Sequence, residues 1–153
     1  MILYYLDAST WVKRYYQEKG TKWVQSLFSR NEPLACATLG VIEVAATLSR
    51  KKKALEINPA QFKQKADDLD DDWGHFVQIQ LTRELTIAAK EIAKKYAHRG
   101  ADAVHLASAL RLEKRVAEHK GRMIMVTSDA ELKKAAEDAD FDVIDPEEQD
   151  AFA

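Results

Sequence analysis

The sequence predicts an α/β fold of three layers, in which helices cover both faces of a central parallel sheet of about five strands. Strand and helix signals alternate from the first residues of the chain to nearly the last. Two of the expected strands, Ile2 to Leu6 and Met123 to Val126, are almost entirely apolar, as central strands buried on both faces are. Parallel strands need crossover connections, which helices supply. The 153 residues suit one domain spanning 1–153.

The first half of the chain contains two of the strands. Ile2 to Leu6 is rich in β-formers and ends at Asp7, and Pro33 to Thr38 is the second expected strand. The helices expected here run from Trp11 to Gln17 with Ser9 or Thr10 as the cap, from Thr21 to Ser29, from about Leu39 to Ala54, and onward from the Asn58-Pro59 pair.

The second half contains the other three strands, which are expected at Phe76 to Leu81, Met123 to Thr127 and Phe141 to Ile144. The helices between them are expected from about Thr82 to His98, from Asp102 to about His119 after a break at Gly100, and from Ala130 to Glu137. Every strand but the last is therefore followed by at least one helix, as the parallel arrangement requires.

Composition and charge exclude few functions. The net charge is −2, so any contact with nucleic acid must be local and made by a few Lys and Arg residues. The lone Cys36 has no partner for an internal disulfide, and we expect it to be a small buried side chain. The sequence has neither a signal-peptide pattern nor an apolar run of about 18 residues, so we expect a cytoplasmic protein without a membrane anchor.

Two aspartates follow the ends of apolar strands. Asp7 comes directly after the first strand, and Asp129 comes shortly after the fourth. Ligands of open parallel sheets bind beyond the carboxyl ends of the strands, so we expect both side chains at the binding edge. The alternative is that each aspartate is the N-cap of the helix that follows it, a role that aspartate favours.

Glu43 and Asp102 are two further acids in apolar surroundings. Val, Ile and Ala flank Glu43, which is unusual for a glutamate on a solvated face, and Asp102 opens a helix of Ala, Val and Leu, where it can also complement the helix dipole. Two carboxylates 4 Å apart repel by about 4 kcal/mol at an effective dielectric near 20. If the four acids converge, we expect them either to take up protons or to bind a hard cation. Oxygen ligands without Cys or His favour Mg²⁺ or Mn²⁺, either of which can activate a water molecule.

Four segments follow the order and spacing of one known family. They are YYLDASTWVKRYY, GVIEVAATLSR, RGADAVHLASAL and MVTSDAEL, and together with the elements around them they cover essentially the whole chain. On these segments the sequence resembles the PIN-domain family, especially the VapC-like toxins of bacterial and archaeal toxin–antitoxin modules. The resemblance implies a PIN-like fold and metal-dependent cleavage of RNA by an endoribonuclease.

The same resemblance implies roles for individual residues. The metal-binding acids of the family match four positions, which are Asp7, Glu43, Asp102 and Asp129. Of these, Glu43 would either hold a metal ion or orient the attacking water. Ser9 and Thr127 match small hydroxyl positions that would supply supporting hydrogen bonds. The resemblance also implies an RNA substrate, a cognate antitoxin and a homodimer.

Basic residues near these acids are candidates for contacts with RNA phosphates. The run 50–53 ends the helix that carries Glu43, although cations also suit a helix C-terminus by themselves. The expected phosphate contacts are Lys13, Arg14, Arg50, Lys51 and Arg99.

Two other groups of residues suggest metal or catalytic chemistry less strongly. The acidic run 67–72 has the spacing of a calcium loop, but Trp73 stands where such a loop needs glycine, so we expect a solvated segment. His105 lies one helical turn after Asp102, and we expect it to be a packed, hydrogen-bonded histidine rather than a metal ligand.

Two other functions stay open at this point. One is phosphoryl transfer through an aspartyl phosphate on Asp7, but such enzymes need a second acid two residues later, where this chain has Ser9. The other is a non-catalytic module that binds RNA or protein without cutting it.

Overall fold

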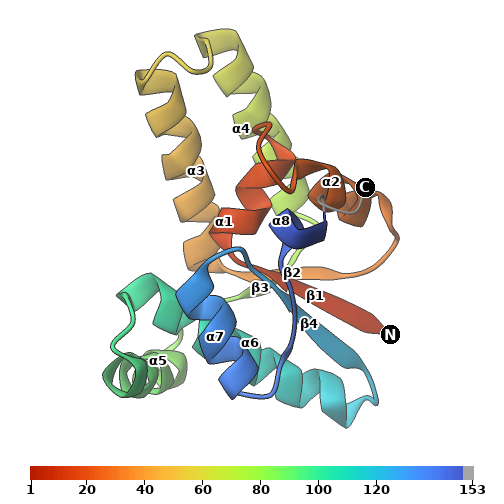
Figure 1. Cartoon of the computed structure of the whole chain (residues 1–153), viewed down its shortest axis with the longest axis vertical. Helices are drawn as coiled ribbons and strands as arrows, with labels where there is room; N and C mark the ends of the chain where they lie inside the picture. The colour runs from red at the N-terminus through yellow and green to blue at the C-terminus, as the bar shows by residue number, and fades with distance from the viewer. Residues whose placement is uncertain (150–153) are drawn as a thin grey trace.

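A parallel sheet of five strands runs through the middle of the computed structural model, which describes residues 1–149 (Figure 1). The strand order is β3-β2-β1-β4-β5. The strands are β1 (Ile2–Leu6), β2 (Leu34–Ala37), β3 (Val77–Ile79), β4 (Arg122–Val126) and β5 (Asp142–Ile144). The apolar strands β1 and β4 are neighbours and pair in register from Ile2–Arg122 to Leu6–Val126. The predicted parallel sheet, with β1 at its centre, is confirmed.

Alternating side chains of β1 divide the core into two layers. Tyr4 and Leu6 pack on one face of the sheet, and Leu3 and Tyr5 pack on the other. Because successive residues of a strand point to opposite faces, a strand that is apolar throughout supplies both layers.

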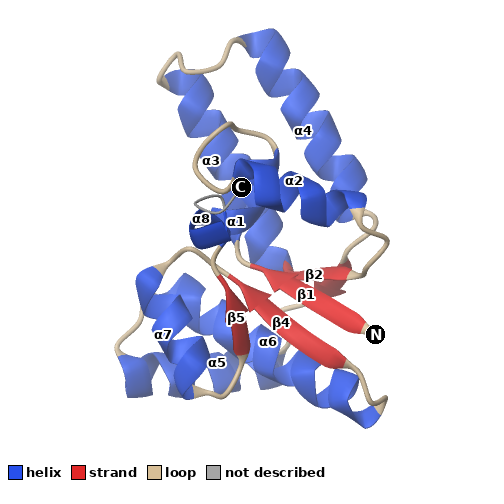
Figure 2. Cartoon of the chain, turned by 45° about the vertical axis from the view of Figure 1, so that its right-hand side comes forward, coloured by secondary structure: helices blue, strands red, loops and turns tan. Residues whose placement is uncertain are grey.

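Helices cover both faces of the sheet (Figure 2). One face carries α1 (Ala8–Trp11), the 3-10 turn η1 (Val12–Arg14), α2 (Thr21–Ser29), α3 (Thr38–Lys53) and α4 (Pro59–Trp73). The other carries α5 (Arg83–Tyr96), α6 (Gly100–Glu118) and α7 (Ala130–Asp138). A short helix, α8 (Pro146–Gln149), follows β5. None of the helices within residues 1–149 is long and apolar enough to cross a membrane.

Capping side chains explain where several helices begin. Asn58 accepts a hydrogen bond from the backbone N–H of Gln61, and the Gln61 side chain accepts one from the backbone N–H of Asn58. This reciprocal pair, followed by proline at the first helical position, fixes the start of α4 as predicted. The Thr82 hydroxyl caps α5 by accepting a hydrogen bond from the backbone N–H of Leu85.

Several predicted boundaries were wrong. The first helix begins at Ala8 with Asp7 as its cap, so neither Ser9 nor Thr10 is the cap, and 3-10 geometry replaces the α-helix after Trp11. Gly100 is the first residue of α6 rather than a break before it. The strand expected to extend to Leu81 ends at Ile79, because its partner strand β2 ends at Ala37, which pairs with Ile79.

Candidate functional site

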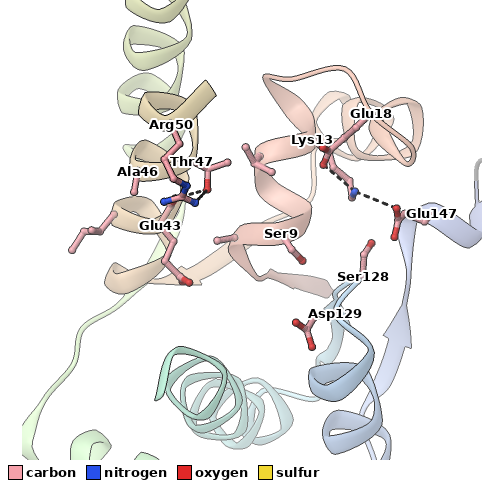
Figure 3. Close-up of a pocket in the computed structure, with 13 residues that line it drawn as sticks. Ser9, Lys13, Glu18, Glu43, Ala46, Thr47, Arg50, Ser128, Asp129 and Glu147 are labelled. Carbon is pink, nitrogen blue, oxygen red and sulfur yellow. Dashed lines mark hydrogen bonds and ion pairs between the residues drawn. The ribbon is translucent and has the colours of Figure 1, made fainter. Parts of the chain in front are cut away.

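The candidate site lies at the carboxyl ends of β1 and β4. The strand order changes direction between these two neighbours, since β2 and β3 lie on one side and β5 on the other. Such a switch point is where open parallel sheets bind their ligands. A groove of about 720 Å³ opens there, and Ser9, Glu43 and Asp129 line it from three different elements (Figure 3).

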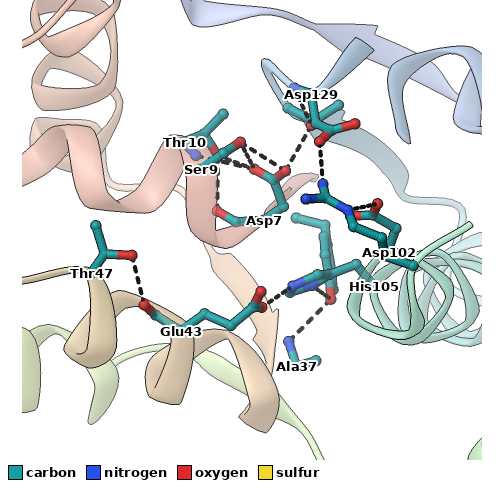
Figure 4. A network of polar contacts seen from close by, with 12 residues as sticks. Asp7, Ser9, Thr10, Ala37, Glu43, Thr47, Asp102, His105 and Asp129 are labelled. Atoms are coloured by element: carbon teal, nitrogen blue, oxygen red, sulfur yellow. Dashed lines mark hydrogen bonds and ion pairs between the residues drawn. The ribbon is translucent and has the colours of Figure 1, made fainter. Parts of the chain in front are cut away.

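Asp7 is almost completely buried, with 4% of its surface exposed, and hydroxyl groups surround its carboxylate (Figure 4). The Ser9 hydroxyl lies 2.9 Å from both carboxylate oxygens, and that of Thr10 lies 2.9 Å from Oδ1. On the other oxygen, the Thr127 hydroxyl donates a hydrogen bond of 2.7 Å to Oδ2. Neutral donors therefore hold this carboxylate in one orientation.

The Asp7 carboxylate remains electrostatically unfavourable despite these donors. Burial raises its pKa above the ordinary value of 3.8, while the neighbouring His105 and the hydrogen bonds from Thr127, Ser9 and Thr10 lower it by less. A buried carboxylate without a full countercharge is stabilised by a nearby cation. The environment of Asp7 is thus suited to binding one.

Asp129 combines the two roles that the sequence left as alternatives. Its Oδ1 accepts a hydrogen bond from the backbone N–H of Leu132, so it is the N-cap of α7. Its Oδ2 accepts a hydrogen bond of 2.9 Å from the Arg99 guanidinium. Asp7 likewise caps α1 by accepting from the backbone N–H of Thr10. Because a carboxylate has two oxygens, capping a helix does not prevent it from facing a cation.

Asp102 lies in the first turn of α6 and shares Arg99 with Asp129. The Arg99 Nε lies 3.3 Å from Asp102 Oδ2, and the Arg99 side chain itself is 73% exposed. Burial raises the pKa of the Asp102 carboxyl, the nearby Asp129 raises it further, and Arg99 lowers it. The positively charged guanidinium of Arg99 therefore lies between Asp102 and Asp129, two of the predicted metal-binding acids.

Glu43 reaches the groove from α3 and is held by a buried histidine. Its Oε1 lies 2.6 Å from Nε2 of His105, which belongs to α6 on the opposite face of the sheet. The other ring nitrogen, Nδ1, lies 2.8 Å from the hydroxyl of Tyr5. Burial alone lowers the pKa of His105, but the neighbouring Tyr5, Cys36 and Glu43 raise it by more.

These contacts differ from the close cluster of four acids that the sequence predicted. Within the described part of the chain, no group of three or more His, Cys, Asp or Glu side chains stands ready to hold a metal ion. The reason is that each acid faces a hydrogen-bonding or ion-pairing partner instead of the other acids. Hydroxyls hold Asp7, His105 holds Glu43, and Arg99 holds both Asp102 and Asp129.

Two of the basic residues expected to contact RNA line the groove. Arg50 lies on α3 and donates a hydrogen bond to the Thr47 hydroxyl. Lys13 is nearly buried and forms ion pairs with Glu18 at 3.1 Å and with Glu147 at 3.9 Å. Arg50 is therefore better placed than Lys13 to approach a phosphate.

Two other expected contacts point elsewhere. Arg14 pairs with Asp72 at 2.6 Å and lines a second pocket beside β2. Lys51 lies over the Tyr16 ring, 3.6 Å from its centre, and pairs with Glu56. The acidic run that contains Asp72 is part of helix α4 and does not form a calcium loop, as expected.

Sequence reasoning missed the contacts that hold the acids in place. It expected His105 to be packed and hydrogen-bonded, which is confirmed, but not its link to Glu43, 62 positions away. It treated Arg99 only as a possible RNA contact. One sequence signal was available, because Arg99, Asp102 and His105 are spaced by three residues and so lie along one face of a helix.

Comparisons with known proteins agree with this fold. The PIN domain family model matches residues 4–138. Ribonuclease VapC45 of Mycobacterium tuberculosis is 33% identical over 110 residues, which span 72% of this chain and 76% of that protein. The crystal structure of PAE2754 from Pyrobaculum aerophilum superposes with a TM-score of 0.64 at 17% identity, covering 99% of this chain and 96% of that one. A chain of a toxin–antitoxin complex from Klebsiella pneumoniae gives 0.58 at 15% identity, covering 93% and 96%.

Proposed function

The chain belongs to the PIN domain family, and on that premise we propose that it is a Mg²⁺- or Mn²⁺-dependent endoribonuclease. The observation that carries the proposal is the placement of the four acids at the switch point. Thr127 and Arg99 connect Asp7, Asp129 and Asp102, while Glu43 and Asp129 line the open groove. The name of the relative from Mycobacterium tuberculosis supports RNA as the substrate.

The residues at the site fit a hard divalent ion. The candidate ligands are the carboxylates of Asp7, Glu43, Asp102 and Asp129, and oxygen donors of this kind suit Mg²⁺ or Mn²⁺ better than Zn²⁺. Burial already disfavours the charge on Asp7, and the guanidinium of Arg99 already lies between Asp102 and Asp129. Both observations mark a place where a positive charge lowers the energy of the folded chain.

Each side chain has a definite task in this proposal. The bound ion would activate a water molecule and stabilise charge on a phosphoryl oxygen. Ser9 and Thr127 orient the Asp7 carboxylate, and His105 orients that of Glu43. Arg50 extends into the groove from α3, where it would contact a phosphate of the RNA. The chain therefore needs no nucleophile of its own.

An assay of RNA cleavage tests the proposal. We expect cleavage with Mg²⁺ or Mn²⁺, none after EDTA, and a loss of about a thousandfold in Asp7→Asn, because a bound metal ion contributes several kcal/mol and each 1.4 kcal/mol is tenfold in rate. Asp67→Asn is the matched control, since that carboxylate is exposed and pairs with Lys63 on α4. Cleavage that survives both EDTA and Asp7→Asn would exclude the proposal, and RNA binding without cleavage would favour a non-catalytic module.

We further propose that the chain is the toxin of a toxin–antitoxin pair. The similarity to a chain of the Klebsiella pneumoniae toxin–antitoxin complex supports the assignment at the level of the fold. Expression of the wild-type chain should arrest growth of the host cell, and Asp7→Asn should not. Growth arrest of equal strength by both chains would contradict a toxin that acts by cleaving RNA.

A further inference from the structure

The imidazole ring of His105 is enclosed at the end of the sheet, with 2% of its surface exposed. Both of its nitrogens have partners, because Nδ1 lies 2.8 Å from the Tyr5 hydroxyl and Nε2 lies 2.6 Å from Glu43 Oε1. Tyr5 belongs to β1 and His105 to α6, whereas Glu43 projects from α3 on the other face of the sheet. The ring therefore connects one helical layer to the other.

The hydrogen-bond partners of the His105 ring determine which of its two nitrogens carries a proton. An ionised carboxylate only accepts hydrogen bonds, so the nitrogen that faces Glu43 must donate. Nε2 is therefore protonated whether the ring is neutral or charged. A ring with its only proton on Nδ1 would set a lone pair against the Glu43 carboxylate at 2.6 Å.

Tyr5 holds the other side of the ring in either charge state. Its hydroxyl accepts a hydrogen bond of 3.2 Å from the backbone N–H of Ala37, which still leaves it one proton and one lone pair. It can donate to Nδ1 of a neutral ring or accept from Nδ1–H of a charged one. Burial raises the pKa of Tyr5, so the hydroxyl keeps its proton.

Close packing of α3 places the Glu43 carboxylate next to Nε2 of this ring. A Cβ added at Gly40 would lie 2.2 Å from Cys36 Sγ and 3.4 Å from the Cε1 of His105, so only glycine lets α3 approach β2 and α6 this closely. Glu43 follows Gly40 by three residues, which is about one helical turn. The approach at Gly40 thus brings the Glu43 carboxylate within reach of Nε2.

We propose that His105, held by Tyr5, is a positioning residue that fixes the Glu43 carboxylate in the groove by donating the Nε2 proton to it. The inference rests on the proposed function, because it assigns to Glu43 the task of a metal ligand. His105 itself touches neither the ion nor the RNA. Its effect is to keep one ligand from rotating into solvent, toward which the Glu43 side chain is 31% exposed.

Two matched substitutions separate this role from simple packing. His105→Gln keeps an N–H donor near the position of Nε2, and His105→Asn keeps one near the position of Nδ1 only. Both remove the ring, so each serves as the packing control for the other. We expect His105→Asn to bind Mn²⁺ about 10- to 100-fold more weakly than the wild type, the usual cost of losing a partner of a metal ligand, and His105→Gln to keep most of the affinity.

A double-mutant cycle with Glu43→Gln tests whether His105 acts through Glu43. If it does, His105→Asn weakens Mn²⁺ binding in the wild-type background and adds little in the Glu43→Gln background. Nitrogen-15 NMR of the histidine ring gives a readout without metal or RNA. We expect a protonated Nε2 whose resonance shifts in Glu43→Gln.

Several outcomes would overturn the inference. They are equal Mn²⁺ affinities of His105→Asn and His105→Gln, additive effects in the cycle, or a neutral ring protonated on Nδ1 alone. A wild-type chain that binds no Mn²⁺ would overturn both the inference and the metal dependence. Normal Mn²⁺ binding without RNA cleavage would overturn the proposed activity only.

Discussion

The two sides of the candidate site hold their carboxylates by different means. On the side of Asp7 and Glu43, the partners are hydroxyls and a buried imidazole, and we call this the anchored side. On the side of Asp102 and Asp129, the partner is the exposed Arg99, and we call this the open side. The buried Thr10, Thr127 and His105 supply most of the contacts on the anchored side, whereas the open side depends on one long side chain that is 73% exposed.

This difference shows which contacts would orient the carboxylates for the proposed metal ion and which would compete with that ion. Hydroxyl donors orient a carboxylate and leave its negative charge for an incoming cation. A guanidinium neutralises that charge, and it would have to move before the proposed metal ion could take its place. The Arg99 guanidinium is exposed, so solvent and salt screen its ion pairs, and exchanging it for a divalent ion would cost little.

Removing a hydroxyl from the anchored side should have the largest effect. Thr127 is fully buried, donates to Asp7 and accepts from the backbone N–H of Asp129. We expect Thr127→Val to lower the free energy of unfolding by about 1–3 kcal/mol, since it leaves buried polar groups unsatisfied, and to weaken Mn²⁺ binding about 10- to 100-fold. Urea unfolding and Mn²⁺ titration measure the two effects.

The control for this substitution is Thr86→Val. The Thr86 hydroxyl is exposed and bonds only within α5, to the carbonyl of Thr82, so we expect a change within about 0.5 kcal/mol. If Thr127→Val proved as stable and as tight in Mn²⁺ binding as Thr86→Val, the anchored side would not hold Asp7 as described.

Removing the positive charge of Arg99 from the open side should strengthen Mn²⁺ binding instead of weakening it. We expect Arg99→Gln to bind Mn²⁺ roughly three- to tenfold more tightly, because the competitor for Asp102 and Asp129 is gone and exposed pairs have effects of this size. Arg83→Gln removes an exposed positive charge from the start of α5 and should leave the affinity nearly unchanged. Weaker Mn²⁺ binding in Arg99→Gln would show that the two sides are not distinct in the way proposed.

Arg50 lies on the wall of the groove, where it donates to the Thr47 hydroxyl and belongs to neither the anchored side nor the open side. If it contacts one phosphate, Arg50→Gln should weaken RNA binding a few-fold and reduce the salt dependence of log K by about one unit of slope, without changing Mn²⁺ affinity. Lys52→Gln is the control, because that ammonium lies over the Phe62 ring instead. Equal effects of the two substitutions in an RNA-binding titration would point to a general loss of positive charge.

The smallest expected effect is on how metal-free stability depends on pH. Burial raises the pKa of both Asp7 and Asp102 above 3.8, so the folded chain binds more protons than the unfolded chain in that range. Stability contributed at these sites therefore falls as pH rises from the ordinary value through the raised one. Asp7→Asn and Asp102→Asn should each gain stability relative to wild type with rising pH. Thermal unfolding in EDTA measures the difference in stability between each variant and the wild type. Differences that stay constant with pH would contradict the prediction.

The sequence contained most of the fold because the fold depends on burial patterns. Ile2 to Leu6 was predicted without error, since a strand paired on both sides and covered on both faces must be apolar throughout. The edge strand β3 was predicted too long, because alternation of side chains continues past the last backbone pair at Ile79. The four-residue α8 was missed, because so short a helix has no periodicity to detect.

The candidate site was only half predictable. Strand ends located Asp7 and Asp129, and an acid in an apolar stretch located Glu43. The partner of each acid depends on side-chain contacts between distant segments, such as Arg99 with Asp129 and His105 with Glu43, which no local pattern records. The sequence argument also overestimated the repulsion among the acids. It assumed that their carboxylates face one another, whereas in the structure they face partners such as Arg99 and His105.

The division of the core into two layers also determines how unfolding can be observed. All three tryptophans of the chain, Trp11, Trp23 and Trp73, belong to the layer formed with α1 to α4, and Trp11 is stacked on Phe76 with ring centres 4.4 Å apart. Tryptophan fluorescence therefore reports on that layer alone, whereas circular dichroism reports on the helices of both. Coincident transitions by the two signals would show that the layers separate from the sheet together, and a gap between them would reveal a half-assembled state.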